Sequence, residues 1–265
     1  MAENYCFGTL AVGQRYRKHA QVLAEDIQQH APGVWLIVLT DRPADFASYP
    51  QVRPVRHRLQ SVKGYHDKRF VVAKALETFE TCIFLDADVR IIGAVPETME
   101  FLPGITARHG CGILKHNTRK NRDSKALPLI RDTAHRLNLD LQDVPWLHEF
   151  MFAFTRQADL SQDFFDAWEE IANFFQSKGI YGGEGNVMGL AAEKVGISFR
   201  LKSHDWFPLF KDNIEKERIK NGQSSPTVKK AYFEEHREIE YPKRTLLGKV
   251  VHKLQSKTSY RYRLL

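Results

Sequence analysis

The chain of 265 residues is long enough to bury one large core, and its 43% hydrophobic and 11% aromatic content is that of an ordinary globular protein. No apolar run approaches the roughly 20 residues of a membrane-spanning helix, so we do not expect an integral membrane protein. The net charge of +7 is compatible with an anionic partner, whereas three widely spaced cysteines without a CxxC pair argue against a zinc ribbon or a disulfide framework.

The first hundred residues alternate between strand-like and helix-like patterns. Short apolar runs indicate buried strands, and apolar residues at helical spacing, with Tyr16 on the inward stripe of the first helix, indicate helices. The predicted elements are strands at 5–12, 34–39, 52–59 and 82–85, the third of them at an edge, and helices at 14–30 and 68–79. This alternation predicts an α/β fold with a mostly parallel sheet flanked by helices. Ligands of such sheets bind beyond the carboxyl ends of the strands, where we expect Thr9, Asp41 and Asp86.

The second half of the sequence is less regular. Its predicted elements are helices at 127–139, 161–178 and 186–195 and strands at 150–154 and 197–201. The stretch at 108–125 is rich in Gly and basic residues and is expected to be a loop near the site. The highly charged segment 211–240 is expected to include a mobile loop around Asn221-Gly222.

The end of the chain is strongly basic. From Tyr241 onward it carries seven Lys and Arg residues, interleaved with apolar ones, and no acidic residue. Such a tail can lie on an anionic membrane surface, or pack one stripe on the domain as a solvated helix. We expect no nucleic-acid partner, because the rest of the chain is nearly balanced in charge and shows no recognition motif. The first residues lack the pattern of an export signal, which predicts a cytoplasmic protein that contacts at most the inner face of the membrane.

Two acidic residues, Asp86 and Asp88, directly follow the apolar run at 82–85. Side chains at i and i+2 of an extended chain point to the same side, so both carboxylates would leave a buried strand together. Hard oxygen ligands in this arrangement suit Mn²⁺ or Mg²⁺, which would stabilise the charge on a departing diphosphate. The alternative is an ordinary turn at the end of a strand, where Asp is common.

The surroundings of this pair resemble the DXD site of the GT-A-fold nucleotide-sugar glycosyltransferases. The run Val38-Leu39-Thr40-Asp41-Arg42-Pro43 is similar to the second-strand signature of the blood-group and α-galactosyl transferases. The run His66-Asp67-Lys68-Arg69-Phe70 resembles the start of the helix before their DXD strand, where a basic residue approaches the donor. Asp-Ala-Asp is also the form seen in glycogenin-like transferases. The resemblance covers roughly residues 5 to 200 in order, although only the DXD region is specific.

This resemblance implies a GT-A domain over residues 1–240, followed by the basic tail at 241–265. Residues 1–92 would form the nucleotide-sugar-binding half and 93–240 the acceptor-side half. The implied activity is metal-dependent transfer of a sugar from a nucleotide-sugar donor, with a UDP-sugar favoured, to a saccharide or glycolipid acceptor. Retention of the anomeric configuration is favoured because the resembled families retain.

Several residues are implied as donor contacts. The resemblance places Thr9 near the base and ribose, Asp41 in the second-strand signature at the donor, and Asp86 near the diphosphate. Arg69, and less strongly Lys74, lie on the predicted helix that leads to the DXD strand, and a guanidinium is suited to a diphosphate or a sugar hydroxyl. The alternative for both is a solvated helix charge.

Carboxylates later in the chain are implied at the reacting centre. Glu184, flanked by glycines, parallels the carboxylate-bearing segment that opens a helix in the resembled families, where it acts as nucleophile or stabilises an oxocarbenium-like transition state. It can equally be an acid at a helix N-terminus, favoured by the dipole. His148 and Glu149 would contact the acceptor or act as base, with Trp146 either as a sugar platform or as an ordinary core tryptophan.

A third metal ligand is implied by the glycogenin-like families alone. His236 is the candidate by its order along the chain, and His204 is the second candidate. In the blood-group-like families phosphate oxygens take this place, and a lone histidine is more often structural.

Two other functions remain open from the sequence. A nucleotidyltransferase that makes nucleotide sugars also couples such a sheet to carboxylate-bound Mg²⁺, but the segment from Gly8 to Lys18 lacks the dense glycine-rich loop expected of one. The other is a non-enzymatic basic protein that binds an anionic surface.

Overall fold

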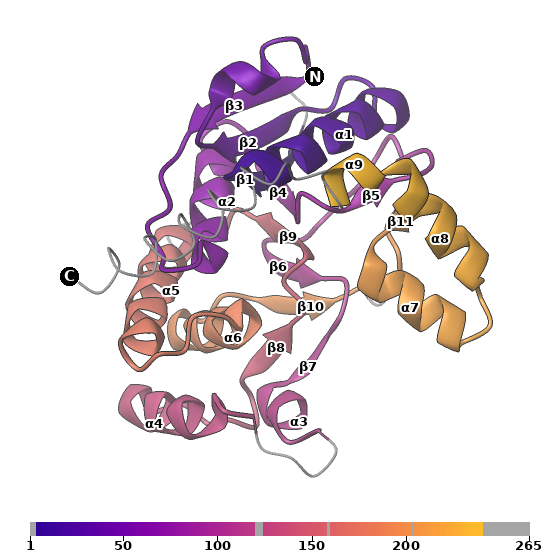
Figure 1. Cartoon of the computed structure of the whole chain (residues 1–265). Coiled ribbons are helices and arrows are strands. Elements are labelled where there is room, and N and C mark those ends of the chain that lie inside the picture. The colour runs from indigo at the N-terminus through magenta and orange to yellow at the C-terminus, as the bar shows by residue number, and fades with distance from the viewer. Residues whose placement is uncertain (1–3, 120–123, 158–159, 203, 241–265) are drawn as a thin grey trace, which may run out of the picture. The chain divides into compact units, whose positions relative to one another are not determined.

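The computed structural model describes residues 4–119, 124–157, 160–202 and 204–240. The chain divides into two compact units, Met1–Phe210 and Lys211–Leu265 (Figure 1). The division falls inside the segment 93–240 that the sequence analysis assigns to the acceptor-side half. The predicted tail at 241–265 lies outside the described residues.

The first unit contains all of the strands that the structure describes. They are β1 Tyr5–Ala11, β2 Leu36–Thr40, β3 Val52–Arg56, β4 Thr81–Leu85, β5 Arg90–Ile91, β6 Gly104–Ala107, β7 Gly110–Gly112, β8 Pro145–Leu147, β9 Met151–Thr155, β10 Phe199–Leu201 and β11 Leu209–Phe210. Its helices are α1 Gln14–His30, α2 Lys68–Leu76, α3 Ile113–Asn117, α4 Leu127–Leu137, α5 Leu160–Ser177 and α6 Glu184–Val195. The second unit contains α7 Asp212–Lys220, α8 Pro226–Glu235 and α9 Arg237–Glu240.

Within the described residues, seven strands form one sheet in the order β10-β6-β9-β4-β1-β2-β3. The β1 strand pairs in parallel with β2 and β4, and β2 pairs in parallel with β3, which confirms the mostly parallel sheet and the edge position of β3. The β9 strand is antiparallel to both β4 and β6. Because β1, β2 and β4 run in the same direction, Ala11, Thr40 and Leu85 end at one edge of the sheet.

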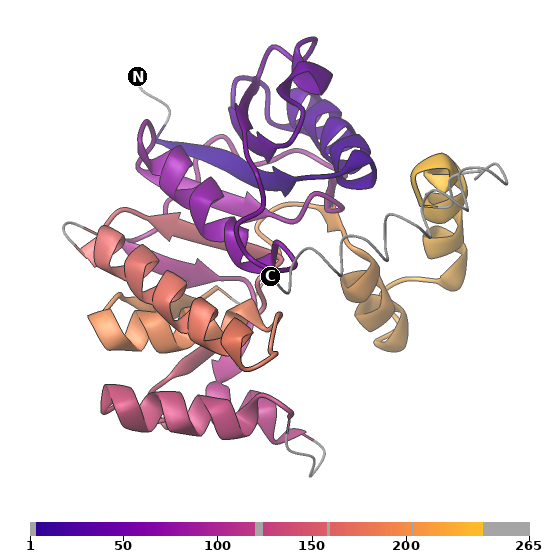
Figure 2. The ribbon, with the colours of Figure 1, turned by 60° about the vertical axis from the view of Figure 1, so that its left-hand side comes forward.

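The helices α1 and α2 belong to successive β-α-β crossovers that step in opposite directions along the sheet. Crossovers of the usual right hand therefore place these two helices on opposite faces. The main core lies on the face of α2, where apolar side chains of α2, α5 and α6 pack on those of β4 and β9. Both views of the ribbon show α5 and α6 side by side along this face (Figures 1 and 2).

Two glycines allow α6 to lie directly on β8. A side-chain carbon at Gly185 would lie 2.0 Å from the carbonyl oxygen of Leu147, and one at Gly189 would lie 1.8 Å from that of Pro145. Because the two glycines are one helical turn apart, they form one smooth face against the backbone of β8. This contact fixes the start of α6 next to the segment that joins β8 to β9.

The structure differs from the sequence-based expectations in several segments, and the short strands β5, β8 and β11 are also absent from the predicted elements. The strand β6, in the middle of one half of the sheet, is absent from the predicted elements. The stretch expected as a loop at 108–125 contains β7 and α3 in its described part. The segment 211–240 forms three helices, and the loop expected around Asn221-Gly222 is the connection between α7 and α8, which begins at Pro226 with the Ser225 hydroxyl accepting from the backbone N–H of Val228. Among the described helices, none has the length and apolar character needed to span a bilayer.

Candidate active site at the carboxyl end of β4

The acidic pair follows β4 in a turn. The N–H of Asp86 donates to the carbonyl of Phe150 at 2.9 Å, and the N–H of Val89 returns to the carbonyl of Asp86 at 3.0 Å. The chain is therefore not extended here as predicted, because it bends to leave the sheet. Ala87 and Val89 are buried, whereas Asp86 and Asp88 are both partly exposed. The turn thus still presents both carboxylates on the accessible side.

A buried lysine lies next to this pair. Lys68, the first residue of α2, places its Nζ 3.0 Å from Asp86 Oδ1 and 3.2 Å from Glu184 Oε1. The same ammonium donates to the backbone carbonyl of Glu149 at 3.2 Å and lies over the ring of Phe84. Burial alone would lower the pKa of Lys68, but the charges of Asp86, Glu184 and Glu149 outweigh it and raise that pKa. Lys68 is therefore a fixed cation that links α2, β4 and α6.

The position of Lys68 depends on the loop before α2. Asp67 is fully buried and accepts hydrogen bonds from His57 Nε2 and from the backbone N–H groups of Gln60 and Ser61, each at 2.7 Å. These donors hold the pKa of Asp67 below its ordinary value despite its burial. An ionised, fully bonded carboxylate thus fixes the chain at the residue directly before Lys68.

Glu184 opens α6 and is buried. Its Oε1 faces Lys68, and its Oε2 accepts the backbone N–H of Gly183 at 3.0 Å. Gly183 has φ +84°, a conformation that strains residues with a side chain. The glycine therefore allows the tight entry into the helix, and the helix N-terminus favours the negative charge on Glu184.

Glu149 completes a group of carboxylates around Lys68. Burial and the negative charge of Glu184 raise the pKa of Glu149 to about 7, although Lys68 opposes this shift. Its Oε2 lies 3.2 Å from where a side-chain carbon would sit on Gly185, so it reaches the start of α6. A carboxyl group that titrates near neutral pH can act as a general acid or as a general base.

Two exposed aromatic residues lie near the acidic pair. Tyr16 is 50% exposed and Tyr65 is 45% exposed, so Tyr16 is not on the inward stripe of its helix as predicted. Partial burial raises the pKa of the Tyr16 phenol, and the charges of Asp88 and Asp86 raise it further. The first turn of α1 and the 3₁₀ turn at Tyr65–Asp67 therefore border the same site.

The donor set is compatible with a divalent cation. Asp86 and Asp88 are adjacent, partly exposed carboxylates, and hard oxygen ligands of this kind suit Mn²⁺ or Mg²⁺ when water and phosphate oxygens complete the coordination. Across the described residues, no group of three or more His, Cys, Asp and Glu side chains is arranged to hold a metal ion.

Arg69 and Lys74 do not join this group. Arg69 Nη2 pairs with Glu169 of α5 at 3.1 Å, and its Nη1 donates to the carbonyl of His66. Lys74 is exposed and pairs with Glu77 on the same helix. Adjacent residues on a helix point about 100° apart, so Lys68 and Arg69 cannot both face Asp86. Of the two, Lys68 is the one that does.

Thr9 and Asp41 lie near the same edge of the sheet but have other surroundings. Thr9 is fully buried and its Oγ1 makes no hydrogen bond within the described part of the chain, so this hydroxyl does not reach an accessible surface. Asp41 accepts from Arg17 Nη1 at 2.7 Å and from the N–H of Gly13 at 3.1 Å, which lowers its pKa. These bonds attach the start of α1 to the end of β2.

His148 and Trp146 lie where β8 leads into β9. The His148 ring packs on Phe150, with centroids 4.7 Å apart, and stacks with Trp146 at 5.9 Å. Trp146 is 7% exposed and one face is covered by His116, so it is a core tryptophan and not an open platform for a sugar. His148 is the more exposed member of the pair.

The two histidines considered as a third metal ligand have distinct surroundings. His236 belongs to the second unit, where its Nδ1 donates to the carbonyl of Tyr232 at 2.9 Å and its ring stacks on that of Tyr232. His204 belongs to the first unit, just after β10, and its backbone N–H bonds to the carbonyl of Lys202. A metal role for either histidine stays a prediction.

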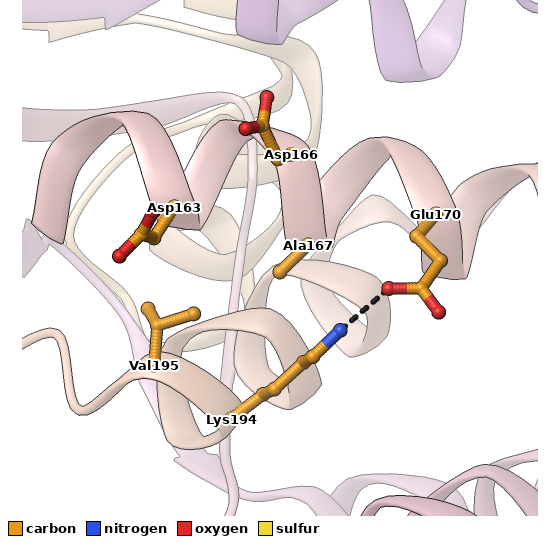
Figure 3. Close-up of a pocket in the computed structure, with 6 residues that line it drawn as sticks. All are labelled: Asp163, Asp166, Ala167, Glu170, Lys194 and Val195. Atoms are coloured by element: carbon orange, nitrogen blue, oxygen red, sulfur yellow. Dashed lines mark hydrogen bonds and ion pairs between the residues drawn. The ribbon is translucent and has the colours of Figure 1, made fainter.

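A surface hollow between α5 and α6 lies away from these residues (Figure 3). It has a volume of about 400 Å³, and two of the residues that line it, Lys194 and Glu170, form an ion pair. Lys194 is near the opposite end of α6 from Glu184, roughly 15 Å along the helix at 1.5 Å per residue. The hollow is thus separate from the carboxylate group.

Sequence patterns alone miss two residues of the site. Lys68 is next to the expected Arg69 in the sequence. The apolar pattern of the helix does not indicate which of the two faces the site, because both side chains are buried. Tyr65 carries no signal, since one aromatic residue in a loop is common. The glycine-flanked position of Glu184 and the apolar run before Asp86 are the patterns that did lead to residues of the site.

Comparisons with known proteins bear on the fold. No protein-family model matches the sequence, and a search of curated proteins finds no match. Among solved structures, the chain is similar to the galactosyltransferase LgtC, crystallised with donor and acceptor sugar analogues. The TM-score is 0.50 at 11% identity, over 73% of this chain and 72% of that one. The α/β fold with its mostly parallel central sheet is therefore consistent with that of a GT-A glycosyltransferase.

Proposed function

We propose that this chain is a metal-dependent glycosyltransferase that moves a sugar from a nucleoside-diphosphate sugar to an acceptor hydroxyl, with retention of configuration. The observation that carries the proposal is the buried Lys68 held between Asp86 and Glu184 at the carboxyl end of β4. Ligands of open α/β sheets bind at this edge. The fold similarity to a galactosyltransferase that binds donor and acceptor sugar analogues supports the same class of reaction.

The donor is proposed to bind across the acidic pair, with Asp86 and Asp88 holding Mn²⁺ or Mg²⁺. When bound, the cation would stabilise negative charge on the departing diphosphate as a Lewis acid. Lys68 orients the Asp86 carboxylate through its Oδ1. The exposed faces of Tyr16 and Tyr65, beside the pair, are suited to stacking on a nucleobase, for which we favour uracil.

Glu184 is proposed to act at the anomeric carbon. Both of its oxygens are oriented, one by Lys68 and one by the N–H of Gly183, so the carboxylate is held in place without a change of rotamer. An oriented anion in a buried site can attack the anomeric carbon or stabilise an oxocarbenium-like transition state. Glu149, whose pKa is about 7, is placed to exchange a proton with the acceptor hydroxyl or the leaving group.

A calorimetric titration with UDP tests the donor half of this proposal. We expect the wild type to bind UDP in the presence of Mn²⁺ and to lose at least about tenfold in affinity, which is 1.4 kcal/mol, when the metal is chelated. Asp88→Asn should lose the metal-dependent part. Asp163→Asn, an exposed aspartate beside the hollow on α5, is the matched control and should bind like the wild type. Equal UDP affinity with and without metal in the wild type would refute the proposed site.

The released product tests the reaction itself. A transferase incubated with a UDP-sugar and Mn²⁺ but no acceptor should release UDP slowly, and Glu184→Gln should abolish that release while UDP still binds. Release of pyrophosphate from a nucleoside triphosphate and a sugar phosphate would instead identify a nucleotidyltransferase. Thermal shifts with a panel of nucleoside diphosphates and Mn²⁺ would identify the base, because a ligand that binds only the native state raises its stability.

A further inference from the structure

Beside the carboxylate group, a row of aromatic rings extends from β9 to α3. The row consists of Phe150, His148, Trp146 and His116, and we call it the ring row. Consecutive centroids are 4.7, 5.9 and 3.6 Å apart, and the His116 and Trp146 planes differ by 12°. The row begins at the residue whose carbonyl accepts the N–H of Asp86. It therefore connects the acidic turn to α3 through direct contacts.

The far end of the ring row carries an exposed cation. The Arg119 guanidinium lies 5.8 Å from the centroid of Trp146, and its Nη2 reaches the sulfur of Cys111 at 3.7 Å. Within the described residues, Arg119 makes no ion pair with a carboxylate, unlike Arg108 nearby, which pairs with Asp205. Its guanidinium is thus held by the Trp146 ring and the Cys111 thiol, and the side chain is exposed.

Two other basic side chains belong to the same region as Arg119. Lys115 is exposed on α3, and the His109 ring contacts Trp146. Burial, together with the positive charge of Arg119 and the proximity of His109, lowers the pKa of His116 to about 4. At neutral pH His116 is therefore an uncharged ring that supports the row, and the fixed positive charge is that of Arg119 and Lys115.

The row also lies beside the reacting group. The Trp146 Nε1 would be 2.8 Å from a side-chain carbon on Gly185, the residue after Glu184. Arg119 is thus separated from the first turn of α6 by the width of one tryptophan. An acceptor that reaches Glu149 and extends along the row would bring its next group to Arg119.

The negative charge of the carboxylates around Lys68 indicates a role for the positive charge of Arg119. Asp86, Glu149 and Glu184 surround a single lysine, and Asp88 adds a further carboxylate to the acidic turn, so an anionic acceptor would be repelled unless a cation compensates. A guanidinium with two N–H donors in one plane is well matched to a carboxylate or a phosphate. A neutral acceptor would need no such residue.

We propose that Arg119 and the two partly exposed histidines of the ring row, His148 and His116, form an acceptor subsite for an acidic saccharide, one that carries a carboxylate or a phosphate, with Arg119 binding the acidic group. This inference rests on the proposed transferase function, since it names the class of acceptor. His148 and the rim of the row contact the saccharide ring, and Lys115 adds a second, weaker charge.

Ligand-observed NMR titrations with matched pairs of saccharides test the subsite. The pairs are methyl α-D-glucuronide with methyl α-D-glucoside, and glucose 6-phosphate with glucose. In the wild type at least one acidic member should bind about tenfold more tightly than its neutral partner, the strength of one charge-assisted hydrogen bond. Arg119→Gln should remove this preference. Arg136→Gln is the matched control, because Arg136 is also exposed and lies over an aromatic ring, that of Phe174; it should keep the preference.

Further measurements show where the acidic saccharide binds and distinguish a failure of this inference from a failure of the proposed function. Asp88→Asn should keep the preference for the acidic saccharide. If the acidic saccharide instead bound at the donor site through its phosphate, this substitution would remove the preference. Equal affinities within both pairs, or an acidic preference that persists in Arg119→Gln, would overturn the inference. If the same wild-type sample binds UDP with Mn²⁺ but shows no acidic preference, the inference fails and the proposed function stands. If the preference for the acidic saccharide depends on Arg119 but the protein shows no metal-dependent UDP binding, the bound saccharide is not an acceptor and the inference is overturned.

Discussion

At the scale of single residues, Lys68 is enclosed by charges that depend on one another. Its ammonium has exchanged water for Asp86, Glu184 and a backbone carbonyl, and each carboxylate in turn relies on that cation. Removing one member of a buried ion pair costs more than the pair itself contributes, because the remaining charge loses its compensation. The arrangement therefore makes specific predictions for stability and for pH.

Lys68→Met should destabilise the fold strongly. The substitution keeps most of the side-chain volume but leaves Asp86, Glu149 and Glu184 without their shared cation, and we expect a loss of about 3–5 kcal/mol in the free energy of unfolding at neutral pH. Urea denaturation measures this change. Lys74→Met on the exposed side of the same helix breaks only the surface pair with Glu77 and should cost less than about 1 kcal/mol. Similar losses for both variants would contradict the central position of Lys68.

Glu149 should make the stability depend on pH in the opposite sense to an ordinary ion-paired carboxylate. Its folded pKa of about 7 exceeds the ordinary value of 4.5, so the native state binds the proton more tightly than the unfolded state. The resulting stabilisation is fully present below about pH 4.5 and is lost as the pH rises through about 7. Glu149→Gln mimics the protonated form and should therefore gain stability relative to the wild type as the pH increases across this window.

The measurement is a series of urea denaturation curves for both proteins between about pH 5 and pH 8. A second expected result is that the slow release of UDP from a UDP-sugar has an inflection near pH 7 that Glu149→Gln removes. Parallel stability curves for the wild type and Glu149→Gln across this window would show that the carboxyl group is not shielded as the structure indicates.

Which residues form the site was only partly predictable at this scale. Asp86 and Glu184 follow a buried apolar run and a glycine pair, which are local patterns visible in the sequence. The choice between Lys68 and Arg69 depends on the rotation of α2 about its own axis, which is fixed by the distant contacts of Asp67 with His57 and of Arg69 with Glu169. Contacts between residues so far apart along the chain leave no local pattern.

At the scale of secondary-structure elements, the contact of α6 with β8 positions Glu184 relative to Glu149. Gly189→Ala tests this contact, because an added carbon would lie 1.8 Å from the Pro145 carbonyl oxygen. In an open helix, alanine would stabilise by about 1 kcal/mol relative to glycine. Here we expect a net loss of about 1–3 kcal/mol, because α6 must move away from the strand. Thermal or urea denaturation measures the sign.

The control for this substitution is Gly112→Ala. Gly112 has φ −62°, and a carbon added there would meet no atom of the described residues within 4 Å. Its effect should stay within about 0.5 kcal/mol, as for most surface changes. If Gly189→Ala is as stable as the wild type, the close approach of α6 to β8 does not hold in solution.

The elements that the sequence predicted are those with strong periodicity. The helix at 14–30 and the buried strands of the first half have the predicted positions because apolar spacing determines which side faces the core. The strand β6 was missed because its four residues, Gly104–Ala107, form too short a run to indicate a strand and pair with strands far along the chain. Tertiary pairing can outweigh such weak local preference.

At the scale of the whole molecule, the described carboxylate site lies within one compact unit. Asp86, Asp88, Lys68, Glu149 and Glu184 all precede residue 210, and β11, which closes on β5, ends that unit. The sheet order and the antiparallel β9 could not be deduced from the sequence, because strands of similar composition are compatible with several orders. The two-unit division falls where the highly charged segment 211–240 begins, but that change of composition predicted a loop there and not a separate unit.

A fragment of residues 1–210 should therefore fold and bind the donor nucleotide by itself. Its core and its site are internal to the unit, and domains with their own core fold independently as a rule. We expect a single cooperative thermal transition and Mn²⁺-dependent UDP binding within about tenfold of the full chain, a difference of 1.4 kcal/mol. Calorimetry on both proteins gives both quantities. A folded fragment that loses metal-dependent UDP binding would contradict this expectation and favour a ligand beyond residue 210, for which His236 is the predicted candidate; His236→Gln in the full chain would then reproduce the loss.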